Sequence, residues 1–173
     1  MDMAEKWPAL LKNDDALLDE LHKLLTDRVQ GDAYSSDGSF ATNLALLPKG
    51  LRAMAATHWL DVSLTLDSIT WHFGNFGEPG LVAETEAGLL ELSLDELANV
   101  FREARDLMVP LLNQRTTDGQ DPYEVLASHG LRERGNEIDG RAWDLCNPTF
   151  GKETIYDAWV RYVRNRPEDV FGT

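Results

Sequence analysis

The sequence predicts an all-α protein: a single-domain bundle of short helices over residues 1–173, with an irregular segment before the last helix. Three observations predict this fold. Apolar residues recur with a period of about 3.6 in several segments, which is the pattern of helices with one buried face. Prolines that suit a first helical turn stand at several expected helix starts. Ser93 is followed three residues later by Glu96, which is the spacing of a capping box.

The first helix is expected over residues 14–30. Leu17, Leu21 and Leu25 share one of its faces, and Gly31 is a suitable stop. Residues 31–45 are expected to be loop-like, because Gly, Ser and Asp are frequent at their start. The two ends of the chain are expected to be loop-like as well. No repeat of 20–50 residues and no linker divides the chain, so a single domain is expected.

Pro48 is suited to open the second helix. Residues 62–66 alternate enough to resemble a strand, but no turn signal or partner strand lies nearby. We therefore expect helix there, followed by a short helical piece at residues 69–73. Residues 74–80 are rich in glycine and include a proline, which predicts a turn.

Pro79 is expected to open the next helix, which runs to the capping box. In that box the Ser93 hydroxyl would accept from the Glu96 N–H, and the Glu96 side chain would return to the Ser93 N–H. The helix that follows is expected to last until Pro110. A short helix is expected at residues 122–129, irregular structure at 131–151, and the last helix at 152–164.

The charge balance is unusual, because thirty Asp and Glu face sixteen Lys and Arg and leave a net charge of −14. A field of this sign repels nucleic acid and anionic membranes, so no direct binding to either is expected. It attracts basic protein surfaces, including those of proteins that bind DNA. The simplest interpretation is that excess acid only keeps the protein in solution.

The location of the protein is predicted from its cysteine content and its apolar patterning. Cys146 is the only cysteine, which excludes an intramolecular disulfide and fits a reducing compartment. The first residues have neither the basic nor the apolar region of a signal peptide. No apolar run approaches the length of about 18 residues that a membrane span needs. We therefore expect a cytoplasmic protein.

No motif in the sequence predicts catalysis, a cofactor or a metal site. His58, Asp61, Asp67 and His72 could be imagined around a metal ion, but no two histidines stand three or four residues apart. A hydrogen-bonded histidine on a helix is the favoured interpretation of His58. Cys146 has no activating neighbours, and the patterns of a serine nucleophile or a phosphate-binding loop are absent. An enzyme would need a cluster of perturbed groups in a cleft, and is the less favoured function.

The aromatic residues between Trp71 and Phe76 lie next to the glycine-rich turn. They could form a pocket for a flat ligand or for a side chain of a partner. They could equally close one end of the helical bundle as part of its core. The second interpretation is favoured.

Two stretches of the chain resemble a known family. The first is the run of residues 67–75, Asp-Ser-Ile-Thr-Trp-His-Phe-Gly-Asn, followed by the Gly/Pro turn, a helix with Glu84, and Leu92-Ser93 before a capped helix. The second is residues 155–163 followed by Phe171. Together they resemble an uncharacterised bacterial domain family that includes acidic DNA-mimic proteins of about this length. The resemblance covers residues 50–110 and 150–171.

The resemblance implies an all-helical, dimer-forming protein whose carboxylates imitate DNA phosphates. Such a protein is an acidic regulator that binds a basic partner, for instance a DNA-binding protein. The alternative is an immunity-type or other regulatory interaction protein without DNA mimicry. The candidate carboxylates for partner binding lie on three helices and are Asp19, Asp27, Glu84, Glu91, Asp95, Glu103 and Asp106.

Duplex DNA carries about one charge per 1.7 Å of its axis, so a mimic needs carboxylates in rows. Glu84 and Glu91 are seven residues apart and share a helix face, and reversing their charge is expected to leave the fold intact. Lys23, Arg102 and Arg105 interrupt the rows.

Overall fold

The computed structural model of the chain describes residues 9–114, 120–147, 149 and 151–171. These residues form ten helices and no strand. The first five are α2 (Asp14–Arg28), α3 (Ser39–Leu44), α4 (Lys49–Leu66), α5 (Ile69–Phe76) and α6 (Pro79–Glu91). The others are α7 (Asp95–Asn113), α8 (Pro122–Ser128), α9 (Arg132–Cys146), α10 (Ile155–Asn165) and α11 (Glu168–Phe171). No helix in these ranges is both long and apolar enough to cross a membrane.

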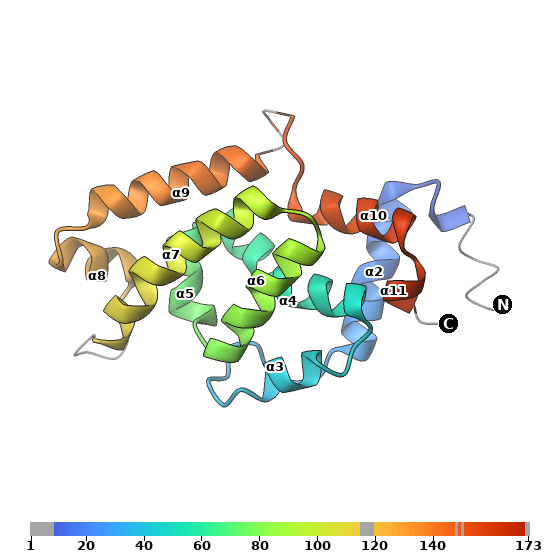
Figure 1. Cartoon of the computed structure of the whole chain (residues 1–173), viewed down its shortest axis with the longest axis horizontal. Helices are drawn as coiled ribbons and strands as arrows, with labels where there is room; N and C mark the ends of the chain where they lie inside the picture. The colour runs from blue at the N-terminus through green and yellow to red at the C-terminus, as the bar shows by residue number, and fades with distance from the viewer. Residues whose placement is uncertain (1–8, 115–119, 148, 150, 172–173) are drawn as a thin grey trace.

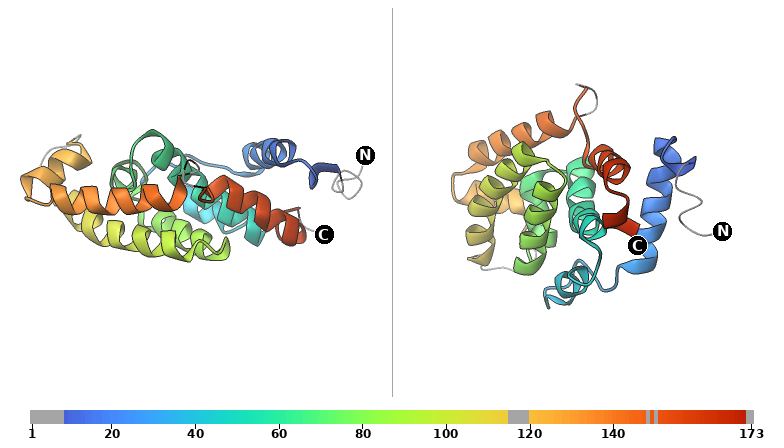
Figure 2. Two further views of the ribbon diagram at one scale, coloured as in Figure 1. Left: turned by 90° about the horizontal axis from the view of Figure 1, so that it is seen from above. Right: turned by 45° about the vertical axis from the view of Figure 1, so that its right-hand side comes forward.

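Helix α4 is the centre of the fold. It contacts α3, α5, α6, α9, α10 and α11, and it is covered over most of its length. Helices α8 and α9 lie at one end of the molecule, against α7, while α2 lies at the other end beside α10 (Figure 1). Figure 2 shows from two further sides that α2 stands at the margin of the bundle.

The tightest helix contact joins α4 to α6. A Cβ atom added at Gly88 would lie 2.9 Å from the Ala53 carbonyl oxygen, so only glycine allows the two backbones to approach this closely. Nearby, the Thr85 hydroxyl donates to the Ala56 carbonyl oxygen at 3.0 Å. Apolar side chains on both sides of this contact are fully buried, and burial of each stabilises the fold by roughly 1.5–3 kcal/mol. These side chains include Leu51, Leu60, Leu81 and Leu89.

Helix α10, the last but one, is held against α4 by a buried tryptophan. Trp159 is completely buried, and its indole N–H donates to the Thr57 hydroxyl at 3.0 Å. Arg161 of the same helix donates to the Leu92 carbonyl oxygen at 2.8 Å, which satisfies one of the free carbonyls at the end of α6. Residues far apart in the sequence therefore form one core.

Several sequence predictions are confirmed. The fold is all-α, and α2, α8 and α10 lie close to the predicted ranges. Pro79 and Pro122 are first-turn prolines. Residues 62–66 belong to α4 and not to a strand. The resemblance to a strand arose because α4 is buried on several sides, so its apolar residues do not follow one stripe.

Four predicted boundaries are wrong. The turn predicted over residues 74–80 is shorter, because α5 continues to Phe76 and α6 begins at Pro79. Residues 31–45 contain the helix α3, and residues 131–151 contain the fifteen-residue helix α9. The pattern of α9 was hidden because its buried stripe consists of Gly135, Ile138 and Ala142, two of which are small. Pro110 lies inside α7, which continues to Asn113. Pro110 is exposed, so the carbonyl that its missing N–H leaves free can face water.

The predicted capping box at Ser93 is also wrong. Ser93 has φ of 59°, the left-handed conformation, and α7 begins after Leu94. The Ser93 N–H donates to the Leu90 carbonyl at 3.0 Å, and the Leu94 N–H donates to the Leu89 carbonyl at 2.9 Å. This is the Schellman pattern that ends a helix, so Ser93 terminates α6 instead of starting α7.

A capping box does exist at the start of α10. The Asp157 N–H donates to the Thr154 hydroxyl oxygen at 3.1 Å, and the Thr154 N–H donates to the Asp157 carboxylate at 2.9 Å. Serine, threonine and aspartate recur throughout this acidic chain, so spacing alone did not distinguish the true box from the false one.

We expect Ser93→Gly to stabilise the protein by about 0.5–1 kcal/mol, because glycine adopts the left-handed conformation without steric cost. For a chain of this size that raises the melting temperature by about 1–3 °C. Thr154→Ala is the matched control and should cost about 1 kcal/mol, as loss of a true N-cap does. A lower melting temperature for Ser93→Gly would contradict the assignment of Ser93 as the end of α6.

Candidate functional site

Glu84, a predicted partner-binding carboxylate, lies in a bidentate ion pair inside the fold. The Arg52 guanidinium of α4 donates to its two oxygens at 2.6 and 2.5 Å. Two parallel charge-assisted bonds of this kind fix both side chains, and here they join α4 to α6. The hydrogen bond that Arg52 donates to Glu84 raises the pKa of the guanidinium, which therefore keeps its positive charge.

Glu91 occupies a similar position at the end of α6. Lys49 lies 2.6 Å from one carboxylate oxygen, while the Tyr162 hydroxyl donates to the other at 2.7 Å and Arg166 lies 3.4 Å from it. Burial would raise the pKa of Glu91, but the hydrogen bonds from Lys49 and Tyr162 outweigh it and hold the pKa below its ordinary value. Glu91 thus connects α6 to the start of α4 and to α10.

Glu103 joins α7 to α9. The Arg141 guanidinium donates to both of its oxygens at 2.8 Å, and Arg134 donates at 3.1 Å. The hydrogen bonds from Arg141 keep the pKa of Glu103 below its usual range. Asp106 lies 2.8 Å from Arg105 and is more exposed than Glu103.

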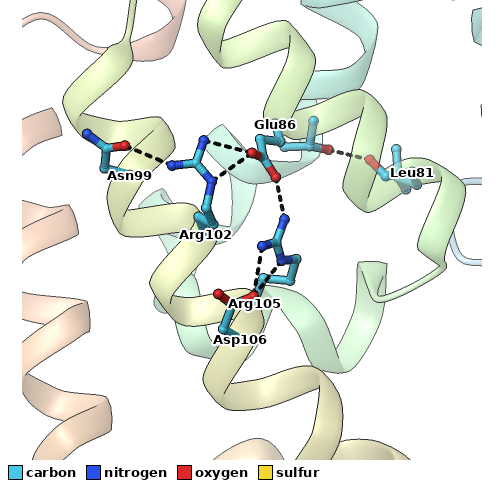
Figure 3. Close-up of polar contacts among 7 residues, drawn as sticks. Leu81, Glu86, Asn99, Arg102, Arg105 and Asp106 are labelled. Carbon is cyan, nitrogen blue, oxygen red and sulfur yellow. Dashed lines mark hydrogen bonds and ion pairs between the residues drawn. The ribbon is translucent and has the colours of Figure 1, made fainter.

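Glu86 was not predicted, yet it holds α6 to α7. Figure 3 shows its carboxylate between Arg102 and Arg105, which donate to separate oxygens at 2.9 and 2.5 Å. Arg102 also donates to the Asn99 side chain at 2.9 Å. Sequence spacing could not reveal these contacts, because Glu86 and its arginines belong to different helices.

The seven candidate carboxylates therefore divide into two groups. Glu84, Glu91, Glu103 and Asp106 are compensated by Arg or Lys. These ion pairs argue against the expectation that reversing Glu84 and Glu91 leaves the fold intact, because a lysine at either position would face Arg52 or Lys49.

Asp19, Asp27 and Asp95 form the second group, which we call the uncompensated carboxylates. All three are exposed, and none forms an ion pair with a described residue. Asp95 stands in the first turn of α7, where its charge also suits the helix dipole.

Most arginines of the described chain are already committed to carboxylates. The cations without an ion pair to any described residue are Lys12, Arg28, Arg132 and Lys152. The excess of acid therefore remains at the surface as charge that the protein itself does not neutralise.

A cavity of about 510 Å³ lies among α2, the segment of residues 29–34, α4 and α10. We call it the imidazole cavity, because His22 of α2 and His58 of α4 line it together with Tyr34, Trp59 and Tyr156. The ring centroids of the two histidines are 5.9 Å apart. Sequence reasoning missed this site because its residues come from five segments, including Phe40 of α3, and show no motif.

The two imidazoles differ in their hydrogen bonding. His58 Nδ1 and the Tyr156 hydroxyl are 2.9 Å apart and share a hydrogen bond. Burial, with a smaller effect of the nearby His22, lowers the pKa of His58 and favours its neutral form. His22 Nε2 is buried and has no hydrogen-bond partner among the described residues.

A second cavity of about 450 Å³ is lined by Asp61, Trp143, Cys146 and Tyr156. Burial raises the pKa of Asp61 to about 6 and that of Cys146 to about 12. The pKa of Tyr156 is raised by the same cause. The cluster thus holds its thiol and phenol protonated, which is the opposite of what an activated nucleophile needs.

The aromatic residues of α5 belong to the core. His72 and Ser63 share a hydrogen bond of 2.9 Å, and burial lowers the pKa of His72 to about 3. Phe73 and Phe76 are buried, while Trp71 packs against Tyr123 with ring centroids 5.3 Å apart. This agrees with the favoured interpretation that the cluster closes the bundle.

The histidines weighed for a metal site, His58 and His72, bond to different partners. Within the described ranges no three or more His, Cys, Asp and Glu side chains form a group that could hold a metal ion. Comparison with protein families, curated proteins and solved structures found no match to this chain.

We expect Asp61→Asn to stabilise the protein above pH 6, by about 1–3 kcal/mol. Ionising the partly buried Asp61 costs free energy in the folded state, so native stability falls as pH rises from the ordinary Asp pKa to about 6. Asparagine removes that cost. Urea unfolding should show a larger gain at pH 7.5 than at pH 5, and an equal gain at both would contradict the raised pKa.

Proposed function

We propose that this chain is an acidic regulatory protein that binds a basic partner protein through carboxylates on its surface. The observation that carries the proposal is that some carboxylates of the chain are neutralised by arginines, whereas others have no ion pair with a described residue. Arginines neutralise the carboxylates between helices, whereas Asp19, Asp27 and Asp95 are exposed and free of ion pairs within the described residues. A surface of this kind steers a basic protein toward it and raises the association rate.

The end of the molecule formed by α2 is the best-supported contact surface. Asp19 and Asp27 are eight residues apart, which corresponds to a rise of about 12 Å along the helix. Lys23 lies between them, but its nearest carboxylate is Glu20 at 3.7 Å, so it belongs to a local pair. The two aspartates thus remain available to cationic side chains of a partner.

DNA mimicry is the more specific form of the proposal, and the resemblance of residues 67–75 favours it. A mimic needs a row of charges nearly as dense as that of duplex DNA. Only short rows of uncompensated carboxylates remain on one chain, because Arg or Lys side chains pair with Glu84, Glu91, Glu103 and Asp106. A symmetric homodimer would be needed to lengthen them. The geometry therefore supports a regulator without mimicry better than a mimic.

We expect the double variant Asp19→Asn, Asp27→Asn to bind the partner about three- to tenfold more weakly at low salt, because two attractive charges are lost. The partner is first captured from a bacterial lysate, identified by mass spectrometry and purified for calorimetry. The difference should shrink near 0.5 M salt, where the screening length falls to a few ångströms.

The matched control is Glu124→Gln, Glu133→Gln, which removes two exposed charges at the α8–α9 end of the molecule (Figure 1). It should bind like the unmodified protein. A folded α2 variant with full, salt-insensitive affinity would overturn the proposal. Competition by excess duplex DNA would support mimicry, while a ternary complex with DNA would support a regulator of another kind.

A further inference from the structure

The imidazole cavity has the size of a ligand-binding site and an opening bordered by aromatic rings. Its volume of about 510 Å³ lies within the range typical of small-molecule pockets. Tyr34 is 58% exposed, yet its ring packs against Trp59 and Phe76 with centroids 5.5 and 4.8 Å away. The Tyr34 N–H donates to the Asp32 carboxylate at 2.9 Å, which orders the turn that carries this ring.

The polar groups that line the cavity determine which charge a bound ligand can carry. Neither lysine nor arginine lines it, whereas Asp32 brings a carboxylate with one oxygen free of the turn hydrogen bond. An anion would therefore meet a like charge and no cationic side chain, and a cation that donates hydrogen bonds fits better.

The aromatic rings decide the shape of that cation. Trp59, Tyr34 and Tyr156 present rings to one cavity. A guanidinium group is planar, stacks on such rings and offers five N–H donors and no acceptor. An ammonium group has the same charge but no plane, and it is held more strongly by water.

We propose that the imidazole cavity binds a guanidinium group, stacked on its aromatic rings and hydrogen-bonded to Asp32. The group comes either from an arginine side chain of the basic partner or from a free alkylguanidinium compound. The first source rests on the proposed function, and the second does not.

The position of the cavity favours an arginine side chain of the partner as the source of the guanidinium group. Thr26 of α2 lines the cavity, and Asp19 stands seven residues before it, on the same face of the helix and about 10 Å along its axis. An arginine inserted into the cavity would therefore place neighbouring basic residues of its chain close to Asp19.

The test uses Nα-acetyl-arginine amide and Nα-acetyl-lysine amide as probes of equal charge. Calorimetry should show that the arginine amide binds at least about fivefold more tightly, because only its side chain can stack. In ¹H–¹⁵N spectra the Trp59 indole and the amides of residues 31–34 should shift. Equal affinity for the two amides, or shifts elsewhere, would overturn the proposal.

Two isosteric variants distinguish binding inside the cavity from general attraction to the negative charge of the protein. Asp32→Asn keeps the oxygen that accepts from Tyr34 and removes the charge in the cavity, so it should weaken arginine amide binding about three- to tenfold. Asp37→Asn, in the same loop but outside the cavity, keeps the oxygen that accepts from the Ser39 N–H at 2.8 Å and should change nothing. If both variants weakened arginine amide binding equally, the binding would depend only on the net charge of the protein and not on the cavity.

The partner identified above distinguishes the two sources. If Asp32→Asn also weakens partner binding, and Asp37→Asn does not, the cavity receives an arginine of the partner. If only the amide is affected, the guanidinium site stands and its ligand is a free compound. If the amide does not bind while partner capture still depends on Asp19 and Asp27, the cavity proposal is wrong and the proposed function stands.

Discussion

The close contact of α6 with α4 is the constraint on which the rest of the structure depends. Gly88 allows the two backbones to approach, and the fully buried leucines around it follow from that approach. Once α6 is placed, Glu84 can reach Arg52 and Glu86 can reach α7. A larger residue at position 88 would separate the helices and break the ion pairs together with the apolar core.

The acidity of the chain has two physical roles. Between helices, carboxylates accept hydrogen bonds from arginine side chains. These ion pairs fix the positions of α4, α6, α7 and α9 relative to one another. At the surface, the remaining carboxylates keep their charge and can act on other molecules. The net charge of −14 describes only the second role. The individual ion pairs decide which residues play which part.

The imidazole cavity and the second cavity lie on either side of Tyr156, which lines both. Burial favours the neutral forms of three of their titratable groups: His58 as imidazole, Cys146 as thiol and Tyr156 as phenol. Such groups bind by hydrogen bonding and stacking and are poor nucleophiles. Both cavities are therefore better suited to recognition than to covalent chemistry, which is consistent with the proposed function.

The sequence by itself determined the helical class, most of the helices and the negative charge, because helix periodicity, first-turn prolines and composition are local properties. It misplaced the capping box, since the conformation of Ser93 depends on how α6 ends. It missed α9, where buried Gly135 leaves room for the side chain of Leu126 of α8.

Only the tertiary structure decided which carboxylates are free. Glu84 and Asp19 look alike in the sequence, but Arg52 approaches Glu84 from another helix and no described cation approaches Asp19. The imidazole cavity was equally invisible, because His22, His58 and Tyr156 meet only when α2 and α10 pack around α4. Pairing and enclosure arise between segments distant along the chain, and local sequence patterns carry no record of them.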